Sequence, residues 1–267
     1  MAGADSLMAA ARWFEASIAY ERVYFLSDDA TERVLANLQK AEALKQLGEF
    51  SKARGDLQRS LTARVKDAHR LELLYQLALC SYLDGDGRSA ESFLMQLDHH
   101  PAHEASSRTF LLRSLVMADL EQYEEIKGQV LEWLEAGEAS TALRVSIMDR
   151  YHDLMTDPGP PEPKDPHRAR MWSTFLPGAG QWYAGSPAWG ALNLASQLTA
   201  LAGFGVLAWN AYYVAGVVVG LGPFQSLYFG GIRQAGELAI RQNNSRQETF
   251  QAAMGEFLLD VANQLDD

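Results

Sequence analysis

Residues 175–190, FLPGAGQWYAGSPAWG, are the part of the sequence that most resembles a ligand-binding loop. Glycine-rich loops hold phosphate when a strand precedes them and Lys-Ser/Thr or a further glycine follows at a fixed distance. In this chain a proline-rich stretch precedes the loop, the next Lys or Arg is Arg233, and Trp182 and Tyr183 occupy the loop itself. The pattern argues against nucleotide binding. It leaves two interpretations, which are turns of a soluble protein or the point where the chain enters a membrane.

Two other stretches contain residue types that bind metals. DHHPAH contains His99, His100 and His103, and LDGDGRSAE, residues 83–91, resembles part of a calcium loop. A zinc site needs ligands that converge on one point at about 2 Å, which neighbouring histidines in a loop seldom achieve. The twelve-position ladder of calcium ligands and its closing Glu do not align with residues 83–91. We therefore expect turns between helices at both places, and no metal.

No other pattern indicates catalysis or a cofactor. The single cysteine, Cys80, lies in the apolar run YQLALCSYL, which is typical of a buried residue. No nucleophile–base pair, carboxylate dyad or metal-ligand spacing stands out. The net charge of −11 argues against binding to a nucleic-acid backbone, because that needs a basic surface. The sequence therefore predicts that the protein is not an enzyme and uses neither a cofactor nor a nucleic-acid partner.

An internal repeat runs through the first half of the chain. Four stretches align at a small or apolar residue, and the successive spacings are 37, 37 and 36 residues. A period of this length indicates a helical solenoid. The aligned residues, which we predict to pack the helices of each repeat, are Ala16, Ala53, Ala90 and Ile126.

A second helical run precedes each aligned stretch, with apolar residues three and four positions apart, as in an amphipathic helix. Gly48, Gly85 and Gly87 fall between the paired helices, where a left-handed glycine ends the first helix. The small and aromatic residues of LGEFSKA, residues 47–53, resemble the tetratricopeptide repeat family, and the resemblance covers about residues 4–137. It implies an array of helix pairs whose concave face binds a protein partner.

The stretch TDPGPPEPKDPH, residues 156–167, contains five prolines. Proline lacks a backbone N–H and disfavours helix in the residue before it, so this stretch should be an extended spacer. The helix predicted just before it, residues 141–155, would cap the repeat array.

Residues 171–232 contain no Asp, Glu, Lys or Arg. Within them, 188–209 and 212–231 are apolar stretches separated only by Asn210 and Ala211. About 20 such residues span the hydrocarbon core of a bilayer as a helix. We therefore predict a transmembrane helical hairpin, and the alternative is a buried hairpin of a soluble protein.

Within this hairpin, polar side chains and glycines should face the partner helix, and aromatic side chains should mark the membrane boundaries. The polar residues are Asn193, Gln197 and Gln225, the glycines are Gly203, Gly205, Gly216, Gly220 and Gly222, and the aromatic residues are Trp182, Tyr183, Trp189, Trp209, Tyr212 and Tyr213.

The sequence PGAGQWYAG followed by an apolar hairpin resembles the TM-two domain family, whose signature is a Pro-Gly-x-Gly-x-x-Tyr-x-Gly turn before the first of two transmembrane helices. The resemblance covers about residues 172–242, and the charged element that many members carry between the helices is absent from this chain. It implies a turn at the membrane boundary without catalytic chemistry. The matching residues are Pro177, Gly178, Gly180, Gln181, Tyr183 and Gly185.

The last part of the chain is predicted to be an amphipathic helix. It has an apolar stripe with acidic flanks, so it should pack on the repeats rather than lie on a membrane surface. The residues of the stripe are Phe250, Met254, Phe257, Leu258, Val261 and Leu265.

Two observations on orientation disagree. Basic residues flank the charge-free segment on both sides, which by the positive-inside rule puts both flanks and the repeats in the cytoplasm. The repeat register, extended backwards, would start the first helix about four residues before Met1, and AGADSL resembles the end left by signal cleavage. Repeat-plus-hairpin chains of this kind resemble bacterial envelope proteins. We expect a protein of the bacterial inner membrane with its repeats on the periplasmic side.

The sequence thus predicts an all-α protein, a tetratricopeptide-like α-solenoid followed by a two-helix transmembrane hairpin and a C-terminal amphipathic helix. The expected function is a membrane-anchored scaffold that recruits a protein partner through the repeats. The alternative is an oligomeric membrane-embedded component, such as a pore or an accessory of transport or insertion, which the repeats regulate. The expected domains are 1–156 for the repeats, 157–170 for the linker, 171–232 for the hairpin and 233–267 for the tail.

Overall fold

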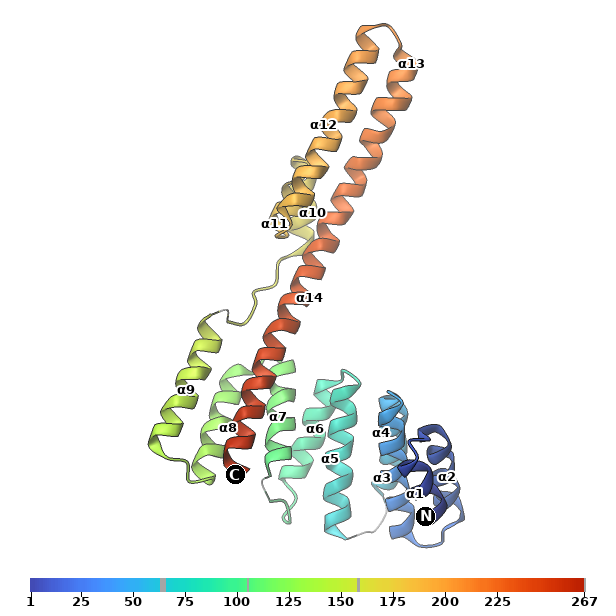
Figure 1. Cartoon of the computed structure of the whole chain (residues 1–267), viewed down its shortest axis with the longest axis vertical. Coiled ribbons are helices and arrows are strands. Elements are labelled where there is room, and N and C mark those ends of the chain that lie inside the picture. Colours follow the sequence, from blue (N-terminus) through green and yellow to red (C-terminus); the bar gives the residue numbers. More distant parts are fainter. Residues whose placement is uncertain (63–65, 105, 158, 267) are drawn as a thin grey trace. The chain divides into compact units, whose positions relative to one another are not determined.

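The structure is a computed structural model, and it describes residues 1–62, 66–104, 106–157 and 159–266. The described residues form helices joined by turns and loops, with no strand among them, which confirms the predicted all-α class. Contacts divide the chain into two compact units (Figure 1). Unit 1 comprises Met1–Tyr151 and Met254–Asp267, and unit 2 comprises His152–Ala253.

Unit 1 is a series of short helices, and consecutive helices from α1 to α8 pack against one another. The helices α2, α4, α6 and α8 begin at residues 13, 50, 87 and 123, so they repeat with the same period as the sequence. The helices are α1 Ala2–Ala9, α2 Trp13–Leu26, α3 Ala30–Gln46, α4 Phe50–Ser60, α5 Asp67–Leu83, α6 Gly87–Asp98, α7 Ser107–Asp119, α8 Tyr123–Ala136 and α9 Thr141–Thr156.

Short polar side chains start several of these helices. Asp29 accepts a hydrogen bond from the Thr31 backbone N–H at 3.0 Å and so caps α3. Asp86 caps α6 in the same way, through the Ser89 backbone N–H at 3.1 Å. Ser106 begins α7. These caps satisfy backbone donors that the first helical turn leaves without a partner.

The turn inside each helix pair contains one left-handed residue. Gly48 and Gly85 have φ of 73° and 78°, as the sequence predicts, whereas Ala11 and Glu121 adopt φ of 54° and 60° at the corresponding positions. The expectation is wrong for Gly87, which is the first residue of α6. A Cβ atom there would lie 2.7 Å from a carboxylate oxygen of Asp119, so this glycine lies in close contact with that side chain.

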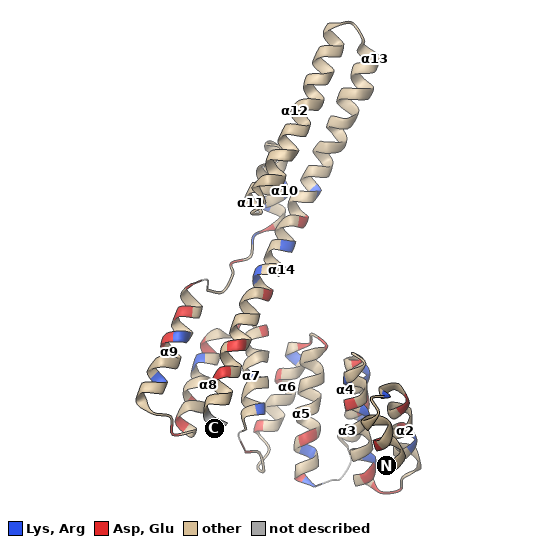
Figure 2. Cartoon of the chain, in the orientation of Figure 1, with Lys and Arg blue, Asp and Glu red and all other residues tan. Residues whose placement is uncertain are grey.

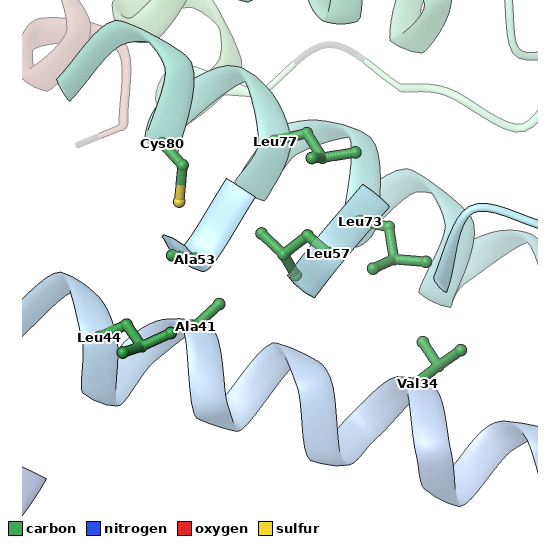
Figure 3. Packing of buried hydrophobic residues seen from close by; sticks show 8 residues of the cluster. All are labelled: Val34, Ala41, Leu44, Ala53, Leu57, Leu73, Leu77 and Cys80. Carbon is green, nitrogen blue, oxygen red and sulfur yellow. The ribbon is translucent and has the colours of Figure 1, made fainter. Parts of the chain in front are cut away.

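The core of unit 1 lies between neighbouring helices. One cluster joins α3, α4 and α5, and its side chains point towards one another between the three helices (Figure 3). The buried members are Val34, Ala41, Leu44, Ala53, Leu57, Leu73, Leu77 and Cys80.

The C-terminal segment packs within unit 1, as we expect from its apolar stripe. The Phe257 ring lies 5.9 Å from the ring of Tyr151, centroid to centroid, and Asp260 forms a 2.8 Å ion pair with Arg150. Tyr151 in turn donates a 2.6 Å hydrogen bond to the carbonyl of Tyr123 in α8. The buried stripe residues of this segment are Met254, Phe257, Leu258 and Val261, whereas the side chain of Leu265 lies outside the described residues.

Unit 2 begins with α10, and then two long apolar stretches follow. The α10 helix starts at Pro166, so it lies partly inside the segment that we expect to be a linker. Figure 2 shows that α12 and the helical run after it carry no charged residue until Arg233. The elements are α10 Pro166–Phe175, α11 Ala179–Tyr183, α12 Pro187–Trp209, α13 Tyr213–Gly216, the π-helical turn η1 Val217–Leu221 and α14 Gly222–Asp266.

The helix α12 and the continuous helical run that begins at Tyr213 are long and apolar enough to cross a membrane. They pack against each other through α13 and η1. The predicted contact face holds for Asn193 and Gln197, which are buried, but is wrong for Gln225, which is exposed on the outer side of its helix.

Some glycines of this region also lie at the contact between the two helices, as predicted, and others do not. A Cβ on Gly220 would lie 2.8 Å from the backbone nitrogen of Phe204, so this glycine permits a close helix crossing. A Cβ on Gly203 or Gly205 would meet no atom within 4 Å. The expectation of close approach is therefore wrong for these two glycines within this chain.

Candidate functional site

The glycine-rich turn, residues 175–190, joins α10 to α12 through the short helix α11. Asp165 caps α10 by accepting a 2.7 Å hydrogen bond from the His167 backbone N–H, and Pro166 occupies the first helical position. Pro177 follows the end of α10, and Gly178 adopts φ of 91°. A Cβ at Gly178 would strike the carbonyl of Gly190, so both its conformation and its surroundings require glycine.

The other two motif positions, 180 and 185, require glycine for different reasons. Gly180 is buried against α10, where a Cβ would overlap the carbonyl of Ala169. Gly185 has φ of 89° and ends α11, with the Ser186 N–H bonded to the carbonyl of Gln181 at 2.8 Å. This pattern, with a second bond from the Gly185 N–H to the Trp182 carbonyl, is a Schellman cap. The chain therefore reverses sharply before α12 begins.

Gln181 connects three elements from the centre of this turn. Its side chain is fully buried. Its Oε1 accepts a 3.0 Å hydrogen bond from the Ser173 hydroxyl of α10, and its Nε2 donates one of 2.9 Å to the carbonyl of Gly231 in α14. The Ser173 oxygen also accepts from the Gly180 N–H at 3.2 Å. A buried amide with both ends satisfied fixes the relative positions of these helices.

Tyr183 faces the other end of the turn. Its hydroxyl oxygen accepts a 3.2 Å hydrogen bond from the Asp165 backbone N–H, and its ring centroid lies 6.0 Å from Nζ of Lys164. The backbone of Lys164 is held by Asn243 of α14, which accepts from its N–H at 2.9 Å and donates to its carbonyl at 2.8 Å. The segment before α10 is thereby fixed to α14.

A hollow of about 980 Å³ lies between this segment and α14, next to the glycine-rich turn. Its polar lining includes Lys164, Arg168, Arg246, Glu162 and Tyr183. Partial burial, followed by the positive charge of Arg246, lowers the pKa of Lys164 from its ordinary value of 10.5. Of the three cationic side chains in this lining, Lys164 and Arg246 raise each other's electrostatic energy. We call it the basic hollow.

The four residues predicted to pack the repeats are all fully buried in unit 1. Ala16, Ala53, Ala90 and Ile126 have no exposed surface. Cys80 is also buried, and burial raises the pKa of its thiol to about 11 from an ordinary value of 9.0. A thiol with such a pKa is neutral at physiological pH, so it is not an activated nucleophile.

The residues that resemble metal ligands have other contacts. Nε2 of His103 lies 3.6 Å from a carboxylate oxygen of Asp98, and Asp86 of the supposed calcium loop pairs with Arg54 at 2.8 Å. Within the described ranges, no group of three His, Cys, Asp or Glu side chains is arranged to hold a metal ion.

Several residues of the site escape sequence reasoning. Ser173 bonds to Gln181 eight residues away, whereas Gly231 and Asn243 contact Gln181 and Lys164 over 50 and 79 residues. Gly190 can be suspected from the sequence, since it is the last residue of the same glycine-rich stretch. In the structure, a Cβ there would collide with the ring of Trp182. A lone Ser, Gly or Asn in a helix carries no pattern that would single it out.

No family model, no curated protein and no solved structure matches this chain. Close glycine contacts and buried hydrogen bonds hold the helices around the turn, and the basic hollow lies beside them.

Proposed function

We propose that this protein is an integral membrane protein in which a TM-two-like hairpin anchors a tetratricopeptide-like array that recruits a protein partner. One observation carries the proposal. The apolar side chains of α12 and of the helical run after it are mostly exposed, because the two helices cover only a small part of each other. Trp209, Val214 and Val218 are 92%, 80% and 68% exposed.

Such exposure is unfavourable in water. Each large apolar side chain left in water forgoes about 1.5–3 kcal/mol relative to burial, and soluble proteins rarely expose contiguous apolar patches of this extent. A bilayer removes this cost because lipid tails cover the same surface. The 23 residues of α12 are long enough to cross about 30 Å of hydrocarbon. Trp209, Tyr212 and Tyr213 lie at the connection between the helices, where aromatic residues suit a membrane boundary.

The glycine-rich turn fits this role as the threshold of the membrane. The Gly180 N–H of the turn donates to the Ser173 hydroxyl, and the Gln181 side chain donates to the Gly231 carbonyl of α14. Polar groups need such internal partners where water is scarce. Lys164 and Arg168 precede the turn, and Arg233 follows the second apolar stretch. The turn would therefore lie at the headgroup level and set the direction in which α12 enters.

For the repeats, the proposal rests on period and packing. Helix pairs that recur every 37 or 36 residues, each with one left-handed turn residue, are the units of a tetratricopeptide-like solenoid. Arrays of this kind bind extended or helical protein segments on their inner face. We further propose that the protein lies in the bacterial inner membrane with its repeats on the periplasmic side.

Carbonate extraction of isolated membranes tests the anchor. The full chain should stay in the membrane pellet at pH 11, because integral helices resist removal of peripheral contacts. The control is a chain that lacks residues 171–232 but keeps both parts of unit 1, and it should appear in the supernatant. Recovery of the full chain in the supernatant would refute the anchor.

A second function, an oligomeric membrane-embedded component, is favoured by one observation. Gly203 and Gly205 lie on α12 with open space beside them, and small residues allow helices of separate copies to approach closely. The mass of the protein in mild detergent separates the two functions. A monomer that captures its partner supports the scaffold, whereas a stable oligomer that Gly203→Leu dissociates supports the embedded component.

A further inference from the structure

Two cationic side chains of unit 2 meet beside the glycine-rich turn. A Cβ placed on Gly185 would lie 3.2 Å from Nζ of Lys164 and 3.9 Å from a terminal guanidinium nitrogen of Arg246. Both charged groups therefore reach the same small volume at the edge of the basic hollow. Only a glycine at position 185 leaves that volume open.

The charges around this point do not balance. Among the described residues, no carboxylate lies within ion-pair distance of Lys164 or Arg246. Arg168, which also lines the hollow, is 3.8 Å from Asp165, and the hollow contains one further acid, Glu162. Like charges this close cost free energy unless an anion lies between them. Partial burial is the larger cause of the lowered pKa of Lys164, and the charge of Arg246 adds to it.

We propose that the basic hollow binds a phosphate group between Lys164 and Arg246, supplied by an anionic phospholipid headgroup or by free phosphate. The lipid source rests on the proposed membrane anchor, because it needs the glycine-rich turn to lie at the headgroup level. The free source does not need the anchor. The hollow, at about 980 Å³, is large enough for a glycerophosphate headgroup.

The side chains have complementary ways to bind such a group. Arg246 offers a planar guanidinium that can donate two parallel hydrogen bonds to phosphate oxygens, and Lys164 adds a compact point charge. Tyr183 uses its hydroxyl oxygen to accept from the Asp165 N–H, so its O–H is directed elsewhere and can donate to a phosphate oxygen.

The site is also held rigidly. The backbone of Lys164 is fixed by its two hydrogen bonds with Asn243, which lies three residues before Arg246 on the same helix. Binding therefore requires little ordering of the main chain, and most of the conformational entropy that is lost on binding comes from two side chains.

The test compares the full chain in detergent with a K164Q/R246Q variant. R88Q/K127Q is the control, because it removes two exposed basic side chains of unit 1 and changes the net charge equally. Native mass spectrometry measures binding of phosphatidylglycerol against phosphatidylcholine, and calorimetry measures binding of inorganic phosphate. Circular dichroism confirms that each variant folds, and K164Q/R246Q should be no less stable than the parent because it relieves a repulsion.

We expect the parent and the control to prefer phosphatidylglycerol, and K164Q/R246Q to lose at least about tenfold in affinity, as losing one charge-assisted hydrogen bond predicts. Loss of lipid binding alone identifies the headgroup as the source, and an equal loss of inorganic phosphate binding identifies free phosphate. Unchanged affinity of K164Q/R246Q for both probes would overturn the proposal. Carbonate extraction of the same variant, which should stay in the membrane, separates this result from a failure of the anchor.

Discussion

The side-chain amide of Gln181 donates a 2.9 Å hydrogen bond to the backbone carbonyl of Gly231, 50 residues further along the chain. Between these residues lie the whole of α12 and the helical run that returns beside it. One buried amide thus ties the start of the first apolar helix to the end of the second. This bond explains why a glutamine belongs in a turn that is otherwise largely apolar and rich in glycine.

Replacing Gln181 by leucine should destabilise unit 2 by about 1–3 kcal/mol, because the Gly231 carbonyl and the Ser173 hydroxyl would lose their partner while buried. Gln225→Leu is the matched control, since Gln225 is exposed on the same apolar region. Thermal unfolding of the full chain in detergent measures both. Equal midpoints for the two variants would show that the Gln181 bonds contribute nothing.

The glycines of unit 2 should respond unequally to alanine. Gly180→Ala forces a methyl group into the carbonyl of Ala169, which we expect to cost about 1–3 kcal/mol through displacement of α11. Gly203→Ala adds a methyl group to open space on α12 and removes backbone freedom from the unfolded chain. It should be neutral or stabilising by less than about 1 kcal/mol. A destabilised Gly203→Ala variant would indicate a neighbouring helix from a second copy.

The elements of this chain could be predicted from the sequence because they depend on local pattern. Apolar periodicity locates the helices of unit 1, and the lack of charge locates α12 within one residue of its observed start. The turn in each repeat also depends on local sequence, but its left-handed position cannot be located by glycine alone. Ala11 and Glu121 adopt the conformation that Gly48 and Gly85 suggest, whereas Gly87 is the first residue of α6.

The contacts around the glycine-rich turn could not be predicted in this way. PGAGQWYAG marks the turn, but the packing of α10 and α14 determines which residues contact it and the segment before it, namely Ser173, Gly231 and Asn243. The same reason explains the wrong expectation for Gln225. A polar residue in an apolar helix is expected to face a neighbour, yet the crossing of α12 with η1 leaves this residue on the outer side.

The left-handed turn residues of unit 1 give a test of the repeat register. Glu121→Gly should stabilise unit 1 by about 0.5–1 kcal/mol. A left-handed conformation costs a residue with a Cβ about 1–2 kcal/mol, and the larger entropy that glycine loses on folding offsets part of this gain. Gly48→Ala should destabilise it by about 1 kcal/mol for the converse reason, since no atom lies near the added methyl group. Chemical unfolding followed by circular dichroism measures both. The same sign for both variants would contradict the shared register.

Cys80 should make the stability of unit 1 depend on pH in the alkaline range. Burial raises the pKa of this thiol to about 11, against an ordinary value of 9.0 for the unfolded chain. Above pH 9 the unfolded thiol loses its proton while the folded one keeps it, so deprotonation favours unfolding. The contribution of Cys80 to the free energy of unfolding is therefore complete below pH 9. It falls by about 1.4 kcal/mol per pH unit as the pH rises from 9 to about 11.

The difference between the parent and Cys80→Ala isolates this effect from the titration of tyrosines and lysines. Urea unfolding at pH 8, 9.5 and 10.5 should show a parent advantage that shrinks with pH. A constant difference would mean that the folded thiol titrates normally. Maleimide labelling provides an independent check, because the buried thiol should react only as fast as unit 1 opens.

The topology of the proposed hairpin can be read from three single cysteines in a Cys80→Ala background. Glu162 and Asn244 are exposed on the two flanks, and Asn210 is exposed at the connection between the helices. Asp165 is unsuitable because it caps α10. A chain that crosses twice puts both flanks on one side and the connection on the other, so an impermeant maleimide applied to spheroplasts should label either both flank cysteines or only the one at position 210.

Labelling of both flanks would place the repeats outside the cytoplasm, in agreement with the proposed periplasmic side. Labelling at position 210 alone would agree instead with the basic residues on the flanks, since these favour the cytoplasm. If only one flank reacts, the chain crosses once and the hairpin is wrong. The weak point is then the second helix, where η1 interrupts the α-helical hydrogen bonds just before Pro223, and an interfacial helix would replace the second span.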